Sequence, residues 1–154
     1  MLLSQPAAGG EFRDRNSILL NLIIDYEKRE KFMQMEQKMV HYELHQNCLV
    51  IYVTDDLDHH AVTYLREYSD RLIEAGNIKH IIFDFTDVGF MDSSGIGLIM
   101  GRYKKVMFLG GRAAVSNVGE VVNRIFSLSG LYQIIERYDT VPEALEAMKK
   151  RRKG

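Results

Sequence analysis

Apolar and polar positions first follow a regular pattern at Val40. Residues Val40–His45 alternate in character, Asn47 provides a turn residue, and Cys48–Val53 is a continuous apolar run rich in β-branched residues. Together these segments predict a β-hairpin. The segment Ile81–Phe85 is mostly apolar with almost no alternation, which is expected of a central strand covered on both faces.

Helical spacing of apolar residues alternates with further short apolar segments along the rest of the chain. Four helices are expected. The first runs from a cap at Asp58 to about Ala75, the second from near Ser94 to Gly110, and the third over Glu120–Leu128. The fourth begins at a cap at Thr140, has Pro142 in its first turn, and has a basic end at Lys149–Lys153. Short strands are expected at Arg112–Ser116 and Tyr132–Tyr138. Strands that alternate with helices of these lengths predict an α/β fold with a mostly parallel sheet and right-handed crossovers.

The pattern divides the chain into three parts. Residues 39–150 form the predicted domain, and residues 151–154 form a basic C-terminal tail. Residues 1–38 are an N-terminal extension that contains the apolar run Ile18–Ile24, too short to span a bilayer. This extension is either an added helix that packs on the domain or on another copy, or a disordered or vector-derived stretch. A start codon assigned too early is a further alternative, because Met33, Met35 and Met39 all precede the first strand.

Composition narrows the class of protein. The 154 residues are 46% hydrophobic and 27% charged, which is ordinary for one globular domain, and the net charge of -1 gives no reason to expect a polyanion as partner. The single cysteine, Cys48, excludes an intrachain disulfide, and no cysteine cluster has metal-ligand spacing. We therefore expect a cytoplasmic protein that neither enters a membrane nor carries a metal or other cofactor.

The segment from Phe90 to Gly97, with the sequence FMDSSGIG, holds the candidate chemistry because it joins a central strand to a helix. A helix N-terminus carries unsatisfied N–H groups and a partial positive charge, so an anion on Ser93 would be stabilised there, although the carboxylate of Asp92 would repel it. The simpler interpretation is that Ser93 and Ser94 are N-cap residues. The segment lacks G-x-S-x-G and a nearby histidine, which argues against a hydrolase nucleophile.

Five short segments, in order and spacing, give the chain a family resemblance. They are Leu57–His60, Ile78–Ile82, Phe90–Gly97, Gly101–Lys104 and Leu128–Leu131. The chain thereby resembles the sporulation-type anti-sigma factor antagonists of the STAS family over about Val40 to Lys149. The resemblance implies the STAS fold, with a five-stranded sheet that starts in a hairpin and with four helices.

The resemblance also implies a function without catalysis. In this family the serine after the aspartate, here Ser93, is phosphorylated by an anti-sigma factor that is also a serine kinase. The unmodified antagonist binds that kinase and releases a sigma factor, and a metal-dependent serine phosphatase restores the unmodified form. The implied partner-binding residues here are Asp58, Asp92, Ser93, Ser94, Gly95 and Gly97.

Two departures from the family pattern concern neighbouring loops. Asp55 and Asp56 stand where the family usually has Gly-Glu, and Val118 and Gly119 replace a proline before the third helix. The first departure adds negative charge to the loop before the first helix, and the second leaves the shape of the other loop open.

The sequence also leaves room for other functions and sites. A STAS domain could also be a scaffold subunit of a stress-signalling complex or an accessory subunit of a lipid or anion transporter. His41 and His45 lie four residues apart on a strand, which is too far for a shared metal, so solvated histidines are expected. The basic C-terminal run is expected to be a solvated end, with no direct contact to nucleic acid, and the chain to be a monomer or a weak homodimer.

Overall fold

The computed structural model describes residues 40–57 and 59–150. The N-terminal extension, the predicted helix cap Asp58 and the basic tail lie outside the described residues. Within the described part, five strands and several helices alternate in the order expected of an α/β fold. The chain therefore has the predicted fold class.

The strands form one sheet in the order β1-β2-β3-β4-β5, which is also their order along the chain. Their bounds are β1 Val40–His45, β2 Cys48–Val53, β3 His80–Asp84, β4 Ala113–Ser116 and β5 Glu136–Tyr138. β1 pairs with β2 antiparallel, whereas β2, β3, β4 and β5 run parallel. β3 is central and fully buried, as its uninterrupted apolar sequence predicted.

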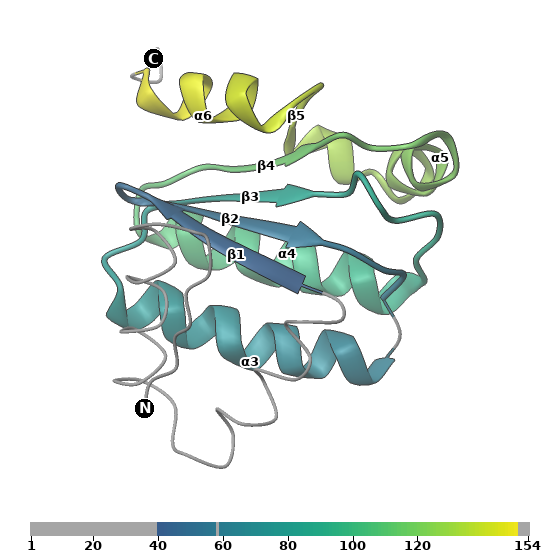
Figure 1. Cartoon of the computed structure of the whole chain (residues 1–154), viewed down its shortest axis with the longest axis horizontal. Coiled ribbons are helices and arrows are strands. Elements are labelled where there is room, and N and C mark those ends of the chain that lie inside the picture. The colour runs from purple at the N-terminus through teal and green to yellow at the C-terminus, as the bar shows by residue number, and fades with distance from the viewer. Residues whose placement is uncertain (1–39, 58, 151–154) are drawn as a thin grey trace.

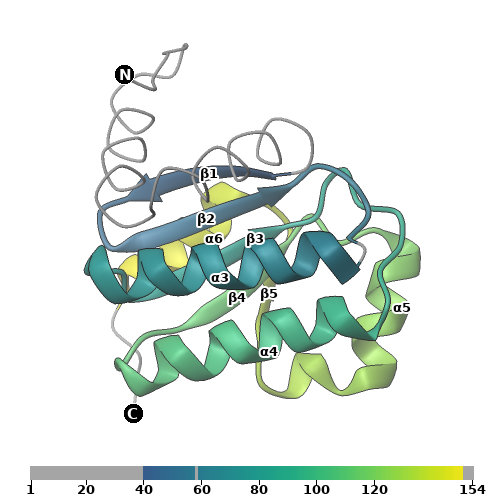
Figure 2. The same cartoon turned by 90° about the horizontal axis from the view of Figure 1, so that it is seen from below.

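Helices cover both faces of the sheet. Helices α3 (His59–Ala75) and α4 (Ser93–Phe108) lie side by side on one face, and α6 (Val141–Lys149) covers the other (Figures 1 and 2). Helix α5 (Glu120–Ser129) lies at the end of the sheet where α4 begins. The parallel strands therefore have their carboxyl ends, and the loops that follow them, at the end of the molecule near α5.

Two apolar clusters of unequal size hold these layers together. The larger lies between the sheet and the pair α3 and α4, and includes Leu49, Phe83 and Phe126. The smaller lies under α6 and includes Val50 and Ile82. An ion pair between Arg102 of α4 and Asp70 of α3, with 2.9 Å between Nη2 and Oδ1, joins the two helices of the larger layer. The helix that begins at the serine pair is thus fixed to both the sheet and α3.

The predicted strand Tyr132–Tyr138 was too long. Its first half is a turn of 3₁₀ helix, η2 (Leu131–Gln133), and only the last three residues pair with β4. Leu131 and Ile135 are buried whereas Ile134 is 37% exposed, a spacing that suits a helical turn better than a strand. Met107, close to the end of α4, is 42% exposed.

The closing helix follows its sequence signals. Thr140 is the N-cap of α6, and its hydroxyl accepts a hydrogen bond from the backbone N–H of Glu143 at 3.2 Å. Pro142 occupies the first turn, where its missing N–H costs nothing. Helix α5 has Gly119 as its N-cap without a side-chain hydrogen bond, so the loop that lacks the family proline still begins a regular helix.

Candidate functional site

Two loops meet at the carboxyl ends of β2 and β3. The loop after β2 contributes Asp56 and Leu57, and the loop after β3 contributes Gly89, Phe90 and Met91. Leu57 and Met91 form an isolated parallel β-bridge. One carboxylate oxygen of Asp56, Oδ1, accepts hydrogen bonds from the backbone N–H groups of Gly89 at 2.9 Å and Phe90 at 3.1 Å. These contacts fix the segment that leads into α4.

Asp92 ends that segment as the N-cap of α4. Its side chain accepts hydrogen bonds from the backbone N–H of Ser94 at 2.9 Å and from the Ser94 hydroxyl. These two bonds, the hydroxyl bond first, lower the pKa of the Asp92 carboxyl below its ordinary value, so Asp92 is ionised at neutral pH. The interpretation of Ser93 and Ser94 as N-cap residues is therefore wrong, because Asp92 occupies that position and both serines belong to the first turn.

The two serines differ in how free their hydroxyl groups are. Ser94 is half-buried and its hydroxyl donates to Asp92. Ser93 is exposed in the first position of the helix. An enzyme that modifies this helix end from solution therefore meets Ser93 first, whereas Ser94 would have to give up its bond to Asp92.

The two glycines of the segment have different surroundings. Gly95 is buried, and a Cβ atom added there would lie 2.8 Å from Sδ of Met91. Gly97 is exposed, with nothing within 4 Å of an added Cβ. The absence of a side chain at Gly95 thus serves the packing of Met91 under α4, while Gly97 leaves a gap on the helix surface beside Ser93 and Ser94.

Comparison with known proteins places this geometry in a family. The family model described as the STAS domain matches residues 39–144. The chain belongs to the STAS-domain family. It is 36% identical over 113 residues to the anti-sigma F factor antagonist of Paenibacillus polymyxa, covering 73% of this chain and 94% of that protein.

Solved structures with the same fold include both phosphorylation states of one STAS protein. The anti-sigma factor antagonist SpoIIAA in its unphosphorylated form has a TM-score of 0.67 and 31% identity, covering 74% of this chain and 99% of that one. The phosphorylated form of the Bacillus cell fate determinant SpoIIAA has a TM-score of 0.59 and 32% identity, covering 70% and 97%. The predicted STAS fold is thereby confirmed.

Of the predicted site residues of this STAS domain, the structure brings Asp92, Ser93, Ser94, Gly95 and Gly97 together in the first turns of α4. Asp58 lies outside the described residues. The sequence did not single out Asp56 as an anchor of the loop before Ser93. The signal that could have found it is its position in the loop after β2, at the end of the sheet where loops from neighbouring parallel strands meet.

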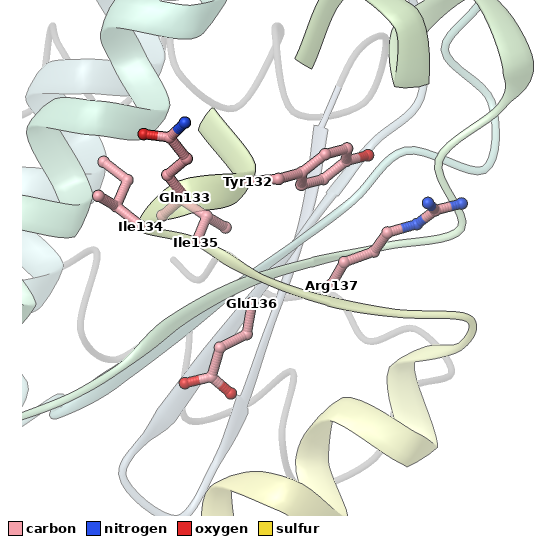
Figure 3. Close-up of a pocket in the computed structure, with 6 residues that line it drawn as sticks. All are labelled: Tyr132, Gln133, Ile134, Ile135, Glu136 and Arg137. Carbon is pink, nitrogen blue, oxygen red and sulfur yellow. The ribbon is translucent and has the colours of Figure 1, made fainter. Parts of the chain in front are cut away.

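A second concave region lies along η2 and β5, away from the serine pair. Figure 3 shows the side chains that line it, with the guanidinium of Arg137 and the ring of Tyr132 on the same side. Arg137 lies 5.5 Å from the centre of that ring, and the Tyr132 hydroxyl donates to Asn123 at 2.7 Å. Glu136 accepts two hydrogen bonds from Arg112. These polar groups are engaged with their neighbours, so this hollow has no counterpart to the exposed hydroxyl of Ser93.

The strand histidines are not simply solvated. His41 and His45 both contact the carboxylate of Glu43, at 3.4 Å and 2.9 Å. In residues 40–57 and 59–150 no group of three His, Cys, Asp or Glu residues is arranged to hold a metal ion. Across the same ranges, no helix combines the length and apolar character needed to cross a bilayer.

Proposed function

We propose that this STAS domain is an anti-sigma factor antagonist that binds an anti-sigma factor with serine kinase activity, releases a sigma factor, and is inactivated by phosphorylation on Ser93. The observation that carries the proposal is the difference between the two serines, since Ser93 is exposed while the Ser94 hydroxyl donates to Asp92. The relatives include anti-sigma F and anti-sigma-B factor antagonists, which supports an anti-sigma factor as the class of partner.

The charges around Ser93 explain how a phosphate could act as a switch. A phosphoserine carries about -1.5 to -2 charges at pH 7. The N-terminus of α4 offsets part of this charge, but Asp92 is ionised beside it, and Asp56 and Asp87 add exposed carboxylates on the two adjoining loops. Phosphorylation would therefore make this end of the molecule strongly negative and reduce its affinity for a partner that fits the neutral serine.

The protein acts in this scheme as a binder and a substrate, with no catalysis of its own. A metal-dependent serine phosphatase restores the unmodified form, and all partners meet it in the cytoplasm. Gly97 and the first turn of α4 supply the contact surface beside the modified residue, since that part of the helix is open to solvent.

The test is direct phosphorylation. The purified chain is incubated with ATP and, in turn, with each serine-kinase anti-sigma factor encoded in the same genome, and the product is mapped by mass spectrometry. We expect one phosphate, on Ser93. Ser94→Ala serves as the matched control, because it removes the neighbouring hydroxyl and should leave phosphorylation of Ser93 in place.

Two results would contradict the proposal. One is an absence of phosphate with every kinase together with no complex between the Ser93→Ala variant and any of these kinases. The other is a phosphate on Ser94 in the wild-type chain, which would mean that exposure does not decide between the two serines.

A further inference from the structure

The loop that presents Ser93 has little apolar packing of its own. Val88 and Met91 are buried at its two sides, but Gly89 and Phe90 between them are exposed, Phe90 by 54%. Neither Gly89 nor Phe90 belongs to a strand or a helix, so their backbone N–H groups lie outside the ladders that hold the neighbouring elements. Something other than burial must keep this stretch in one conformation.

Asp56 supplies that restraint from a loop more than thirty residues earlier in the chain. Its Oδ1 accepts both N–H groups, from Gly89 at 2.9 Å and from Phe90 at 3.1 Å. Hydrogen bonds from a backbone N–H to an ionised carboxylate are stronger than those to a neutral acceptor. Asp55 in turn accepts the N–H of Asp56 at 2.8 Å, which orders the loop that carries the carboxylate.

The restraint is transmitted to Ser93 over a short distance along the backbone. Immediately after Phe90 comes Met91, which forms the bridge with Leu57, and then Asp92, which caps α4. Asp56 thus holds the backbone at Gly89 and Phe90, and Leu57 holds it at Met91. The position of the serine relative to the sheet depends on this segment as well as on α4.

From these contacts we infer that Asp56 is a positioning residue for phosphorylation of Ser93: it holds the Gly89–Phe90 backbone so that the first turn of α4 is presented to the kinase in one conformation. The inference rests on the proposed function, since it concerns the kinase that modifies Ser93. It also gives the Asp55-Asp56 pair an internal role, in addition to any effect of its charge on the choice of partner.

The effect should appear in substrate binding more than in the chemical step. If the loop is ordered for only a fraction of the time, the apparent affinity for the kinase falls by that fraction, and kcat is unchanged once the complex has formed. Losing both hydrogen bonds is expected to raise KM about fivefold to tenfold. Because Asp56 is exposed, global stability should change little.

Three variants separate hydrogen bonding from charge. Asp56→Ala removes the acceptor, and Asp56→Asn keeps an oxygen acceptor without the charge. Asp87→Asn is the matched control, because it removes one exposed carboxylate from the loop that follows β3 without touching the two bonds. Each variant is compared with the wild-type chain in KM and kcat for phosphorylation of Ser93, in amide hydrogen exchange at Gly89 and Phe90, and in its urea midpoint.

We expect Asp56→Ala to raise KM and speed exchange at the two amides about fivefold to tenfold, Asp56→Asn to change both less than about threefold, and Asp87→Asn to leave both near wild type. Unchanged exchange and KM in Asp56→Ala would overturn the inference even if Ser93 is phosphorylated normally. Equal loss in all three variants would overturn it in favour of a charge effect. If the wild-type chain is not phosphorylated at all, the proposed function fails, and the exchange comparison still decides whether Asp56 holds the loop.

Discussion

The two ends of α4 use polar groups in different ways. At its C-terminal end, the chain turns through Gly110 and Gly111 to Arg112, the residue before β4. Arg112 donates two hydrogen bonds to Glu136 and one to the carbonyl oxygen of Ala147 in α6. At its N-terminal end, Asp92 bonds only within its own turn and Ser93 is left exposed. The C-terminal end joins strands and helices of the fold, whereas the N-terminal end joins two loops and presents Ser93.

This difference indicates where the sequence can change without loss of the fold. Contacts at the C-terminal end of α4 involve backbone in close approach and a largely buried arginine, so substitutions there should destabilise the fold. Contacts at the N-terminal end involve exposed carboxylates, so substitutions there should alter the presentation of Ser93 and leave the fold intact. The following measurements test that contrast.

The largest effect is expected at Gly111. A Cβ atom there would lie 1.5 Å from the carbonyl oxygen of Lys79, which is backbone and cannot rotate away. Gly111→Ala should therefore destabilise the protein by about 4 kcal/mol, measured by urea denaturation. Gly97→Ala, inside α4 and with open space around it, is the control and should be neutral or slightly stabilising, by up to about 1 kcal/mol. Equal stability of the two variants would contradict the contrast.

A smaller loss is expected when the side chain of Arg112 is replaced. The side chain of Arg112 is 14% exposed, and its guanidinium lies 2.6 Å from the carboxylate of Glu136 and donates to it from two nitrogens. Arg112→Met should cost about 2 kcal/mol, because Glu136 and the carbonyl oxygens at the end of α6 lose the hydrogen bonds that Arg112 donates, while the Tyr138 hydroxyl still donates to Glu136. Arg112→Lys keeps the charge without the planar fork and should fall between wild type and Met. A wild-type urea midpoint for Arg112→Met would show that this network does not stabilise the fold.

The smallest expected effect is a difference in pH dependence: groups near the two ends of α4 should lose their contribution to folding stability at different pH values. Burial, followed by the positive charges of Lys79 and Arg112, lowers the pKa of His80, whose Nδ1 accepts the N–H of Arg112 at 3.0 Å. Because the folded state binds the proton less readily than the unfolded state, stability should begin to fall as pH drops below the ordinary value of about 6.5. At the N-terminal end of α4, the pKa of Asp92 is lowered. Its contribution to folding stability is therefore retained until the pH falls below about 3.9, the ordinary value for an aspartate.

Urea midpoints between pH 7 and pH 5 check this prediction. The wild-type midpoint should decline over that range, and His80→Gln should remove the part of the decline that His80 causes. Asp92→Asn, which keeps a capping side chain, should leave the pH dependence in this range unchanged. A decline that persists in full in His80→Gln would assign it to other groups.

Much of this arrangement was predictable from apolar spacing, but the details of the site were not. The burial of β3 and the cap at Thr140 followed from local sequence, because one signal dominated at each position. Asp92, Ser93 and Ser94 are three successive residues that can each cap a helix, so sequence alone could not choose among them. The contact of Asp56 with Gly89 and Phe90 spans more than thirty residues and depends on the register of β2 and β3.

The comparison with SpoIIAA supports the STAS fold of this chain. The difference between the two serines, in contrast, comes from the geometry of this chain itself. In the proposed function Ser93 is the residue that is phosphorylated, and the bond from the Ser94 hydroxyl to Asp92 distinguishes the two serines. Ser93 therefore carries the central claim of the account.

The most direct test is the dissociation constant of the anti-sigma factor for two forms of this protein, unmodified and stoichiometrically phosphorylated, measured by isothermal titration calorimetry in the same buffer. We expect phosphorylation to weaken binding at least tenfold, about 1.4 kcal/mol, and Ser93→Asp to weaken it in the same direction. Equal affinity of the unmodified and phosphorylated forms would contradict the account.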